Sequence, residues 1–305
     1  MPYTALISNL RALPQETLTS DQREALVSLL DYLEAPSPYA LYLLTGYAGT
    51  GKTYLLRSIT EAATRAGLHV ELMASTGRAA KVLTGATGRQ ASTIHRTIYR
   101  ASTQLQEEGG SFQLGRVSAG RPTLFIVDEA SMISGDTGEV TPFGSGNLLD
   151  DLLSYVWSAD ESKLILVGDT AQLPPVGTPL SDALNAEVLT SRYGLEVYGT
   201  ELREVVRQKK GGILHNATQL RELLEDSADL DPEELLPIHL ETEGWRGIFA
   251  VEPGEFINTI DEAYRRYGME ECLVICPSNK KALECNHAIR SAVLYYEEEA
   301  VVRGE

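Results

Sequence analysis

The segment GYAGTGKT, which runs from Gly46 to Thr53, points most directly to chemistry. It follows an apolar run at residues 40–45 and leads into a stretch whose apolar residues recur at helical spacing. In this G-x-x-x-x-G-K-S/T pattern, glycines let backbone N–H groups surround phosphate oxygens, the lysine reaches the β- and γ-phosphates, and the hydroxyl can ligate Mg²⁺. A strand before the loop and a helix after it favour a phosphate-binding loop over a simple glycine-rich turn. The residues expected at the phosphates are Gly46, Ala48, Gly49, Thr50, Gly51, Lys52 and Thr53.

Two adjacent carboxylates, Asp128 and Glu129, follow a second apolar run at residues 124–127. Asp128 is expected to hold Mg²⁺ through its water shell, and Glu129 to orient and deprotonate an attacking water. Such a pair can also be no more than the solvated end of a strand, but the phosphate-binding loop earlier in the chain favours catalysis. A small-molecule kinase does not need the glutamate, so the pair indicates hydrolysis of a nucleoside triphosphate rather than phosphoryl transfer.

An amide, Gln172, follows a third apolar run at residues 164–167, within the segment GDTAQLPPV. At the end of a central strand it can hydrogen-bond both a γ-phosphate and the attacking water, and so report whether hydrolysis has occurred. The alternative interpretation is a polar turn stiffened by Pro174 and Pro175.

The elements that must position these residues alternate between strand and helix. Four short, nearly continuous apolar runs are typical of buried parallel strands, and longer helix-compatible stretches separate them. These runs lie at residues 40–45, 70–74, 124–127 and 164–167. The first 35 residues are expected to be helical, with Thr19 or Ser20 as an N-cap. The pattern predicts an α/β fold.

Three further segments complete this organisation. A small hairpin is expected at residues 104–114. A loop rich in Gly, Ser and Thr is expected at residues 134–147, as either an active-site flap or an ordinary surface loop. A strand at residues 272–276, with helices at 256–267 and 279–293, is expected to open a second unit.

Composition places the chain among ordinary globular proteins, with 305 residues, 43% of them hydrophobic and 23% charged. Its formal net charge of −17 argues against binding nucleic acid by bulk attraction, so such a partner must be held locally. No run approaches the ~18–20 apolar residues of a membrane helix, and the start lacks the features of a signal peptide, so a cytoplasmic protein is expected. The three cysteines, Cys272, Cys276 and Cys285, form no disulfide framework and are expected to be reduced thiols.

Six motifs, taken in order, resemble those of the superfamily 1 DNA helicases of the RecD-like and phage Dda-like branch. They are TGYAGTGKT, ASTGRAAKVL at residues 74–83, STIH at 92–95, DEAS at 128–131, GDTAQLPPV at 168–176 and LREVVRQ at 202–208. The resemblance covers roughly residues 18–290. In that family, two RecA-like domains hydrolyse ATP between them and move along single-stranded DNA, typically from 5′ to 3′.

The resemblance implies a RecA-like P-loop NTPase fold with a mainly parallel central sheet. It implies a first domain at residues 1–200, with a small pin-like insertion at about 97–122, and an incomplete second RecA-like domain at 201–305. ATP and Mg²⁺ are the implied cofactors, and single-stranded DNA is the implied partner, in replication, recombination or repair. We expect a cytoplasmic monomer with no membrane partner.

The family also implies roles for residues around the nucleotide. Gln22 matches the glutamine that reads adenine, although a solvent-facing helix residue is the alternative. Gln172 would sense the γ-phosphate. Arg207 matches the arginine that reaches the triphosphate from the second domain and stabilises the transition state, where the alternative is a surface salt bridge.

A second set of residues matches the motifs that contact the DNA strand, through hydroxyls, backbone N–H groups and a few cations. They are Thr76, Gly77, Arg78, Lys81, Thr93 and His95, with Pro174 and Pro175 beneath a base. His95 can equally be a packed or capping histidine. The hairpin at residues 104–114 occupies the position of the strand-separating pin, although a plain surface hairpin would have the same sequence pattern.

The sequence departs from the family near its end. After Asn279 it contains neither a VHKSQG-like motif, which couples DNA to ATP, nor an LSRA-type motif with a further arginine. We therefore expect a truncated chain, with a degenerate relative as the alternative, that binds Mg-ATP or ADP and hydrolyses and unwinds poorly. A nucleotide-gated DNA- or protein-binding module without translocation is the second functional hypothesis, and a P-loop kinase of small molecules is the third.

Overall fold

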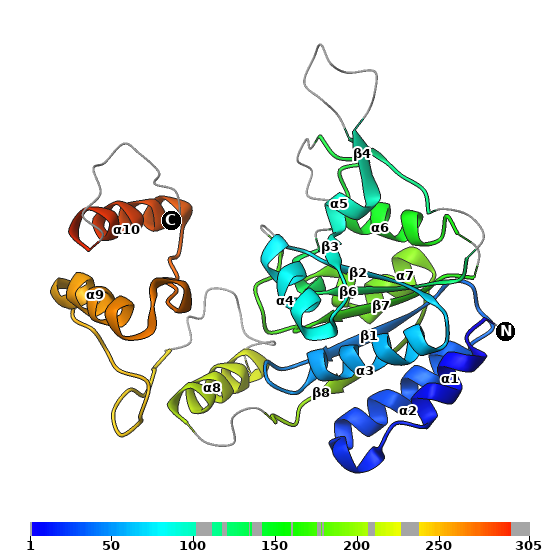
Figure 1. Cartoon of the computed structure of the whole chain (residues 1–305), viewed down its shortest axis with the longest axis horizontal. Coiled ribbons are helices and arrows are strands. Elements are labelled where there is room, and N and C mark those ends of the chain that lie inside the picture. Colours follow the sequence, from blue (N-terminus) through cyan, green and yellow to red (C-terminus); the bar gives the residue numbers. More distant parts are fainter. Residues whose placement is uncertain are drawn as a thin grey trace. The chain divides into compact units, whose positions relative to one another are not determined.

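The computed structural model describes residues 2–101, 112–117, 121–133, 135, 142–159, 161–175, 178, 180–206, 211–226 and 238–293. The chain divides into two units, residues 1–209 and residues 210–305, and each is described by itself (Figure 1). Strand β8 (Glu196–Leu202) belongs to the first unit, so a boundary at residue 200 would cut through it.

A sheet of six parallel strands is the centre of the first unit. The strands are β1 (Ala40–Gly46), β2 (His69–Ala74), β3 (Ala91–Thr93), β6 (Thr123–Asp128), β7 (Lys163–Gly168) and β8. Their order is β3-β2-β6-β7-β1-β8, and every neighbouring pair is parallel. The four strands predicted from apolar runs are the four inner strands, which are almost entirely buried, and this confirms the α/β expectation.

Helices cover both faces of this sheet. On one face lie α1 (Thr4–Arg11), α2 (Ser20–Glu34), α3 (Lys52–Arg65) and α4 (Gly77–Thr87). On the other lie α5 (Ile94–Ile98), α6 (Leu148–Val156) and α7 (Ala186–Tyr193). Short 3₁₀ turns lie at Gln15–Thr17 (η1), Ala130–Met132 (η2) and Asp182–Leu184 (η3). Because side chains alternate along a strand, Tyr42 of β1 enters one core and Leu43 the other.

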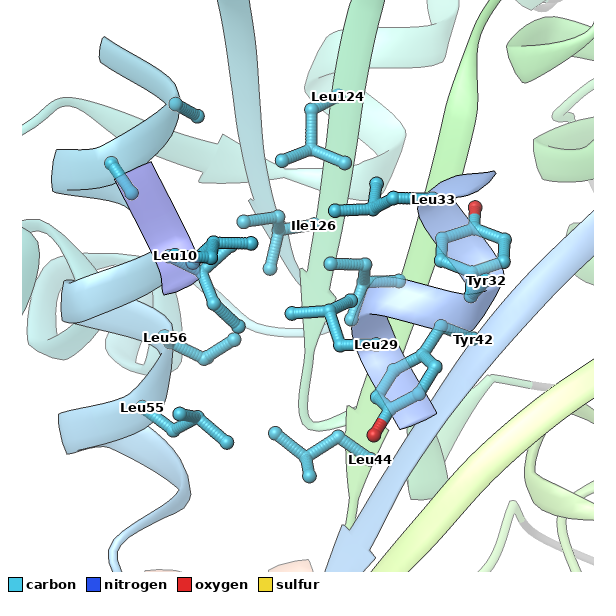
Figure 2. Close-up of a cluster of buried hydrophobic side chains, with 14 of the residues drawn as sticks. Leu10, Leu29, Tyr32, Leu33, Tyr42, Leu44, Leu55, Leu56, Leu124 and Ile126 are labelled. Carbon is cyan, nitrogen blue, oxygen red and sulfur yellow. The ribbon is translucent and has the colours of Figure 1, made fainter. Parts of the chain in front are cut away.

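The core under α2 and α3 is built mainly from leucines (Figure 2). Leu29 and Leu33 of α2 and Leu56 of α3 meet side chains of β1 and β6 there, among them Leu44 and Ile126. The apolar spacing that predicts α2 therefore corresponds to its buried face. Of the two predicted N-caps, Thr19 and Ser20, Thr19 is the one observed, and it accepts a hydrogen bond from the N–H of the third helical residue.

Tyr32 and Lys163 fasten the carboxyl end of α2 to the sheet. The buried Tyr32 hydroxyl donates to the Leu164 carbonyl (2.9 Å) and accepts from the Leu164 N–H (2.7 Å). The Lys163 ammonium lies 4.6 Å from the Tyr32 ring centroid and donates to the carbonyls of Tyr32 (3.1 Å) and Ala35 (3.2 Å). The lysine thereby donates to carbonyl groups in the last turn of the helix, where intrahelical donors run out.

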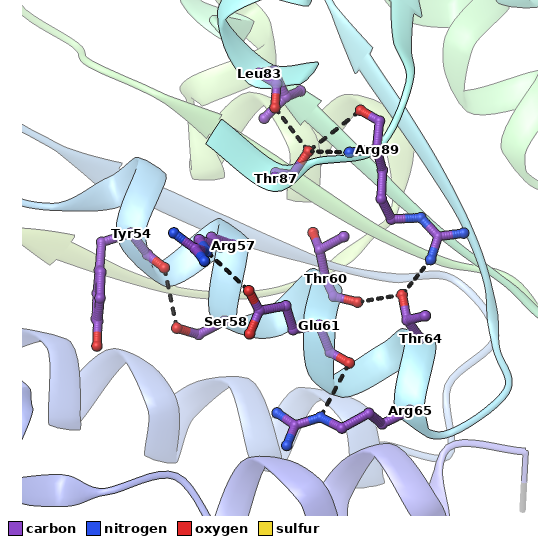
Figure 3. Close-up of polar contacts among 10 residues, drawn as sticks. All are labelled: Tyr54, Arg57, Ser58, Thr60, Glu61, Thr64, Arg65, Leu83, Thr87 and Arg89. Carbon is purple, nitrogen blue, oxygen red and sulfur yellow. Dashed lines mark hydrogen bonds and ion pairs between the residues drawn. The ribbon is translucent and has the colours of Figure 1, made fainter. Parts of the chain in front are cut away.

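Helix α4 is fixed to α3 by polar contacts at its carboxyl end (Figure 3). Gly88 ends α4 in the left-handed conformation, with φ of +68°. The Arg89 guanidinium then donates to the Thr64 hydroxyl of α3 (2.5 Å). Thr87 donates to the Leu83 carbonyl (2.7 Å) and accepts from the Arg89 N–H (3.3 Å). These contacts set the direction of α4 and thus the position of its first turn, at the end of β2.

A two-stranded antiparallel hairpin joins β4 (Tyr99–Ala101) to β5 (Phe112–Leu114). Its existence was expected, but its first strand lies before the predicted range of 104–114, because Tyr99 and not a later residue pairs with Leu114. Residues 102–111 lie outside the described residues. Within the predicted loop at 134–147, the described residues 142–144 run beside β5.

The regular elements in the described part of the second unit are helices. It contains α8 (Gly212–Asp226), η4 (Pro253–Glu255), α9 (Phe256–Tyr267), η5 (Met269–Glu271) and α10 (Asn279–Ala292). The helices predicted at 256–267 and 279–293 are thus confirmed. The buried Asn216 of α8 pairs with the backbone of Glu241, donating to its carbonyl (2.8 Å) and accepting from its N–H (2.7 Å). Among the described helices of the whole chain, none has the length and apolar character needed to cross a bilayer.

The prediction of a strand at residues 272–276 is wrong. Cys272 has an extended backbone, with φ of −112° and ψ of 138°, but the segment pairs with no strand among the described residues. Leu273 and Ile275 are 64% and 87% exposed. An apolar run becomes a strand only where a neighbouring strand accepts its hydrogen bonds.

Conversely, the apolar pattern predicts neither β3 nor β8. β3 has only three residues. β8 lies at the edge of the sheet, and its exposed or half-buried Glu196, Gly199 and Thr200 interrupt any continuous apolar run. An edge strand with one neighbour does not need the composition of a buried one.

We expect Tyr32→Phe to lower the free energy of unfolding of the first unit by about 1–3 kcal/mol, because the buried backbone of Leu164 loses a partner. Urea denaturation followed by circular dichroism measures this change. Tyr39→Phe, at a tyrosine that is 59% exposed, is the matched control and should change stability by less than about 0.5 kcal/mol. Equal stability of Tyr32→Phe and the unaltered chain would show that the hydroxyl contributes nothing.

Candidate nucleotide site and DNA-binding edge

Most of the predicted site residues follow the carboxyl ends of parallel strands, which all meet at one edge of the sheet, whereas Gln22 lies in α2. Strand β1 leads into the phosphate-binding loop, β6 into Asp128 and Glu129, and β7 into the segment with Gln172. Strands β2 and β3 lead into Thr76 and Thr93. Open parallel sheets bind ligands outside this edge, so the topology gathers there residues that the sequence keeps far apart.

The loop from Gly46 to Gly51 contains positions that no side chain fits. A Cβ on Gly46 would lie 2.5 Å from the Leu202 carbonyl oxygen. Gly49 and Gly51 have φ values of +84° and +89°, a left-handed conformation that glycine adopts without strain. Gly51 is also the N-cap of α3, so the loop leads directly into the N–H groups of a helix amino terminus. This combination forms a cradle for anionic oxygens.

Lys52, the first residue of α3, folds back over the loop. Its ammonium donates to the carbonyls of Gly46 (2.5 Å) and Tyr47 (2.9 Å). Burial raises the pKa of Asp128 and of Glu129, the charge of Asp128 raises that of Glu129 further, and the Lys52 charge lowers both. The lysine and the two carboxylates therefore lie within electrostatic reach of one another.

Glu129 has a backbone conformation that is unusual for its residue type. Its φ and ψ are 55° and 42°, in the left-handed region, and its N–H donates to Asp128 Oδ1 (2.9 Å). Holding a residue other than glycine in this region costs on the order of 1–3 kcal/mol, and such residues cluster at functional sites. The strain marks the same glutamate that the motif predicts.

Gln22 is buried and joins α2 to the phosphate-binding loop. Its N–H donates to the Thr19 hydroxyl (3.2 Å) and its Oε1 accepts from the Thr19 N–H (3.1 Å), which completes a capping box. Its Nε2 donates to the Thr50 carbonyl (3.1 Å), and a Cβ on Gly51 would overlap this nitrogen. The alternative of a solvent-facing residue is therefore wrong, because the side chain packs against the loop.

The segment that leads to Arg207 is held at the same loop. The Tyr47 N–H donates to the Leu202 carbonyl (3.1 Å), and the Val206 N–H donates to the Gly49 carbonyl (2.9 Å). Arg207 itself lies outside the described residues. The chain thus contacts the phosphate-binding loop one residue before the predicted arginine.

Asp21 of α2 holds this segment from a second direction. One of its oxygens, Oδ2, accepts hydrogen bonds from the N–H groups of Arg203 (2.7 Å) and Glu204 (2.8 Å). These two bonds are the main reason why the pKa of Asp21 is lowered. Sequence reasoning misses this residue, because its partners lie in a segment 182 and 183 positions away.

Asp169, to which the motifs assign no role, shapes the turn that carries Gln172. It is 1% exposed, its Oδ1 accepts from the Ala171 N–H (3.0 Å), and its carbonyl accepts from the Gln172 N–H (3.1 Å). An aspartate that starts such a turn is the sequence signal that could have found it. Gln172 is exposed and, with Pro174, lines a cavity of about 330 Å³. Pro174 and Pro175 are half-buried.

Thr76 and Thr93 begin two helices at neighbouring strand ends, since Ala74 of β2 lies opposite Thr93 of β3. The Thr76 hydroxyl caps α4 by accepting from the Ala79 N–H (3.2 Å), and the Thr93 hydroxyl caps α5 by accepting from the Arg96 N–H (3.2 Å). The structure thus brings together the two motifs predicted at the DNA strand. The first two turns of these helices also include the exposed Gly77, Arg78 and Lys81 and the half-buried His95.

His95 packs into an aromatic cluster. Its ring centroid lies 5.7 Å from that of Tyr99 and 5.1 Å from that of Phe143. Burial lowers the pKa of His95, which favours the neutral ring. This geometry supports the alternative of a packed histidine, and a contact with DNA stays a prediction.

Thr53 and Asp128 suit Mg²⁺ by their chemistry. A hydroxyl and a carboxylate are hard oxygen donors, and Mg²⁺ is commonly held by one or two protein ligands together with phosphates and water. Thr53 lies in the first turn of α3, directly after the glycine cradle. Asp128 lies close enough to Lys52 that the charge of the lysine lowers the pKa of the aspartate. These residues fit a magnesium ion bound jointly with a triphosphate.

The chain is similar to several known proteins. The ATP-dependent RecD2 DNA helicase of Deinococcus radiodurans is 33% identical over 192 residues, which are 63% of this chain and 24% of that protein. The ATP-dependent DNA helicase dda of enterobacteria phage T4 is 29% identical over 210 residues, which are 68% of this chain and 43% of that protein. The Pif1 helicase from Candida albicans matches in structure with a TM-score of 0.42 and 19% identity, over 88% of this chain and 60% of that one.

The chain spans less than half the length of the two curated relatives. A family model described as AAA domain matches residues 17–231, which include every predicted site residue from Gln22 to Arg207. This match covers more than half of the sequence, and the chain therefore belongs to the AAA domain family.

Proposed function

We propose that the chain is the ATP-binding and ATP-hydrolysing part of a DNA helicase that moves along single-stranded DNA. The observation that carries the proposal is the grouping of Lys52, Asp128 and Glu129 beside the glycine cradle. Phosphate binding, metal binding and activation of water need these groups in one place. The similarity to the RecD2 and Dda helicases supports DNA as the partner, and 5′ to 3′ movement follows from the family resemblance.

Each group has a proposed part in hydrolysis. Lys52 would exchange its bonds to the loop carbonyls for oxygens of the triphosphate. Glu129 would take a proton from the attacking water, a task for which a pKa raised by burial is suited. Gln172 would contact the γ-phosphate, and Arg207 would stabilise charge that develops on it. Mg²⁺, when bound at Thr53 and Asp128, supplies positive charge to the phosphates.

We propose further that Thr76, Arg78, Lys81, Thr93 and His95 contact the strand, and that Pro174 and Pro175 lie beneath a base. Their common place at the carboxyl edge of the sheet supports this. Local placement of a few cations also agrees with a chain whose net charge of −17 cannot attract DNA as a whole. The assembly that we propose is a cytoplasmic monomer, with the second unit as part of a second RecA-like domain.

Hydrolysis of Mg-ATP, measured with and without poly(dT), tests the proposed activity. Lys52→Ala should abolish nucleotide binding and turnover, because it removes the cation at the phosphates. Glu129→Gln should bind Mg-ATP normally but lose about 10²–10⁴-fold in turnover, because the amide cannot accept the proton. Transfer of the γ-phosphate to a metabolite would contradict the proposal. Affinity for DNA that depends on nucleotide, with turnover unaffected by poly(dT), would indicate a binding module without translocation.

Replacing Gln22 separates its two suggested roles. Gln22→Met removes both the capping box and the bond to Thr50, and we expect about tenfold weaker Mg-ATP binding and a reduced preference for ATP over GTP. Thr19→Ala is the control, because it removes only a cap, worth about 1 kcal/mol, and leaves the bond to Thr50. Titrations with fluorescent ATP and GTP analogues measure the affinity and the preference of each variant, and melting curves measure its stability. Equal weakening of ATP and GTP would show that Gln22 supports the loop without reading adenine.

A further inference from the structure

Residues 142–145, shortly before α6, form a bracket that holds the base of the β4–β5 hairpin. The Phe112 N–H donates to the Pro142 carbonyl (2.7 Å), and the Phe112 carbonyl accepts from the Gly144 N–H (2.9 Å). Phe112 and Phe143 thus form a parallel bridge, while the other edge of β5 pairs Phe112 with Ala101 of β4. The bracket is therefore a third strand-like edge of the hairpin.

The Phe143 side chain ties three other elements together. Its ring is stacked on Phe112 of β5, with centroids 4.8 Å apart and an angle of 21° between the planes. It also lies 5.3 Å from the Tyr99 ring of β4 and meets the His95 ring of α5 edge-on at 5.1 Å. One side chain thus contacts both strands of the hairpin and the histidine of the motif assigned to DNA. Ring pairs at these distances stabilise packing.

A buried carboxylate anchors the bracket to α6. Asp151 is 5% exposed, and its Oδ2 accepts hydrogen bonds from the Tyr99 hydroxyl (2.7 Å) and from the Ser145 N–H (3.0 Å). Gly144, next to Ser145, has φ of +46°, and a Cβ there would overlap the same carboxylate oxygen and crowd the Tyr99 ring. The position therefore requires glycine for reasons of space as well as of backbone conformation.

We propose that this bracket sets the position of the hairpin base and of His95 for contact with a single DNA strand, an inference that rests on the proposed function. Phe143, Gly144 and Asp151 are positioning residues in this arrangement, since they act through His95 and the hairpin. A surface that is already ordered pays less conformational entropy when it binds, so loosening the bracket weakens DNA binding without touching the nucleotide site. Of the loop predicted at 134–147, the described residues 142–145 are thus packed against the hairpin.

Gly144→Ala tests the inference, with Gly194→Ala as a matched control. Both glycines have positive φ, of +46° and +65°, but a Cβ on Gly194 meets nothing within 4 Å. The two substitutions therefore impose a similar backbone strain, and only the first displaces Asp151. Phe143→Ala and Phe143→Tyr form a second pair, in which the tyrosine retains the stacked ring.

Two measurements read the outcome independently. Hydrogen exchange should accelerate at the amides of residues 99–101 and 112–114 in Gly144→Ala and Phe143→Ala, and stay unchanged in Gly194→Ala. Fluorescence anisotropy with labelled oligo(dT) should show about five- to tenfold weaker binding in the same two variants, recovered in Phe143→Tyr, with affinity for a fluorescent ADP analogue unchanged. The unchanged ADP affinity excludes a general loss of folding.

The contrary results separate the two proposals. Unchanged hydrogen exchange at the hairpin in Gly144→Ala and Phe143→Ala would overturn the bracket. Accelerated exchange with oligo(dT) affinity equal to that of the unaltered chain would overturn its role in DNA contact. Failure of the unaltered chain to bind oligo(dT), with or without nucleotide, would overturn the proposed function instead, and with it the role of the bracket at DNA.

Discussion

The parallel pairing of β1 with β7 on one side and β8 on the other is the constraint on which the nucleotide site depends. It places Gly46 opposite Leu202, so close that no Cβ fits between them, and Thr45 opposite Gly168. The phosphate-binding loop therefore leaves the sheet between the turn of Asp169 and the segment that leads to Arg207. A shift in the register of β1 against β7 or β8 would separate the loop from that turn or from that segment. On the β8 side, the loop is hydrogen-bonded to Leu202 and to Val206.

The electrostatics of the site are local and differ from those of the whole chain. The chain carries a net charge of −17, yet the loop offers N–H groups and one ammonium to its surroundings. Lys52 rests on two carbonyls and faces two carboxylates whose pKa values burial raises. Burial thus favours protonation of the acids, and the lysine opposes it.

Contacts distant in sequence shape the edge of the sheet at which we propose that DNA binds. The Arg89–Thr64 bond fixes the direction of α4, and the bracket at residues 142–145 fixes the hairpin against α5. Both sets of contacts lie at the ends of helices and strands rather than at the residues predicted to contact DNA. Preorganisation of this kind reduces the conformational entropy that the protein loses when a strand binds.

The inner strands, the start of α2 at Thr19 or Ser20 and the phosphate-binding and carboxylate motifs could be predicted from the sequence alone. Continuous apolar runs predict strands that are buried on both faces, and a loop closed by short-range geometry has a local sequence pattern. The same apolar signal gave a wrong prediction at residues 272–276, because this segment pairs with no strand among the described residues. The apolar signal did not predict β8, because an edge strand buries less of its surface and needs fewer apolar residues.

The tertiary structure alone decided which residues support those motifs. The bonds from Gln22 to Thr50, from Asp21 to Arg203 and from Tyr99 to Asp151 join elements 28 to 182 positions apart. No spacing rule links such partners, because they are brought together by the order of strands and the packing of helices on them. Local patterns identify the groups that perform chemistry, whereas the partners that hold those groups in place are set by long-range packing, which only the folded chain defines.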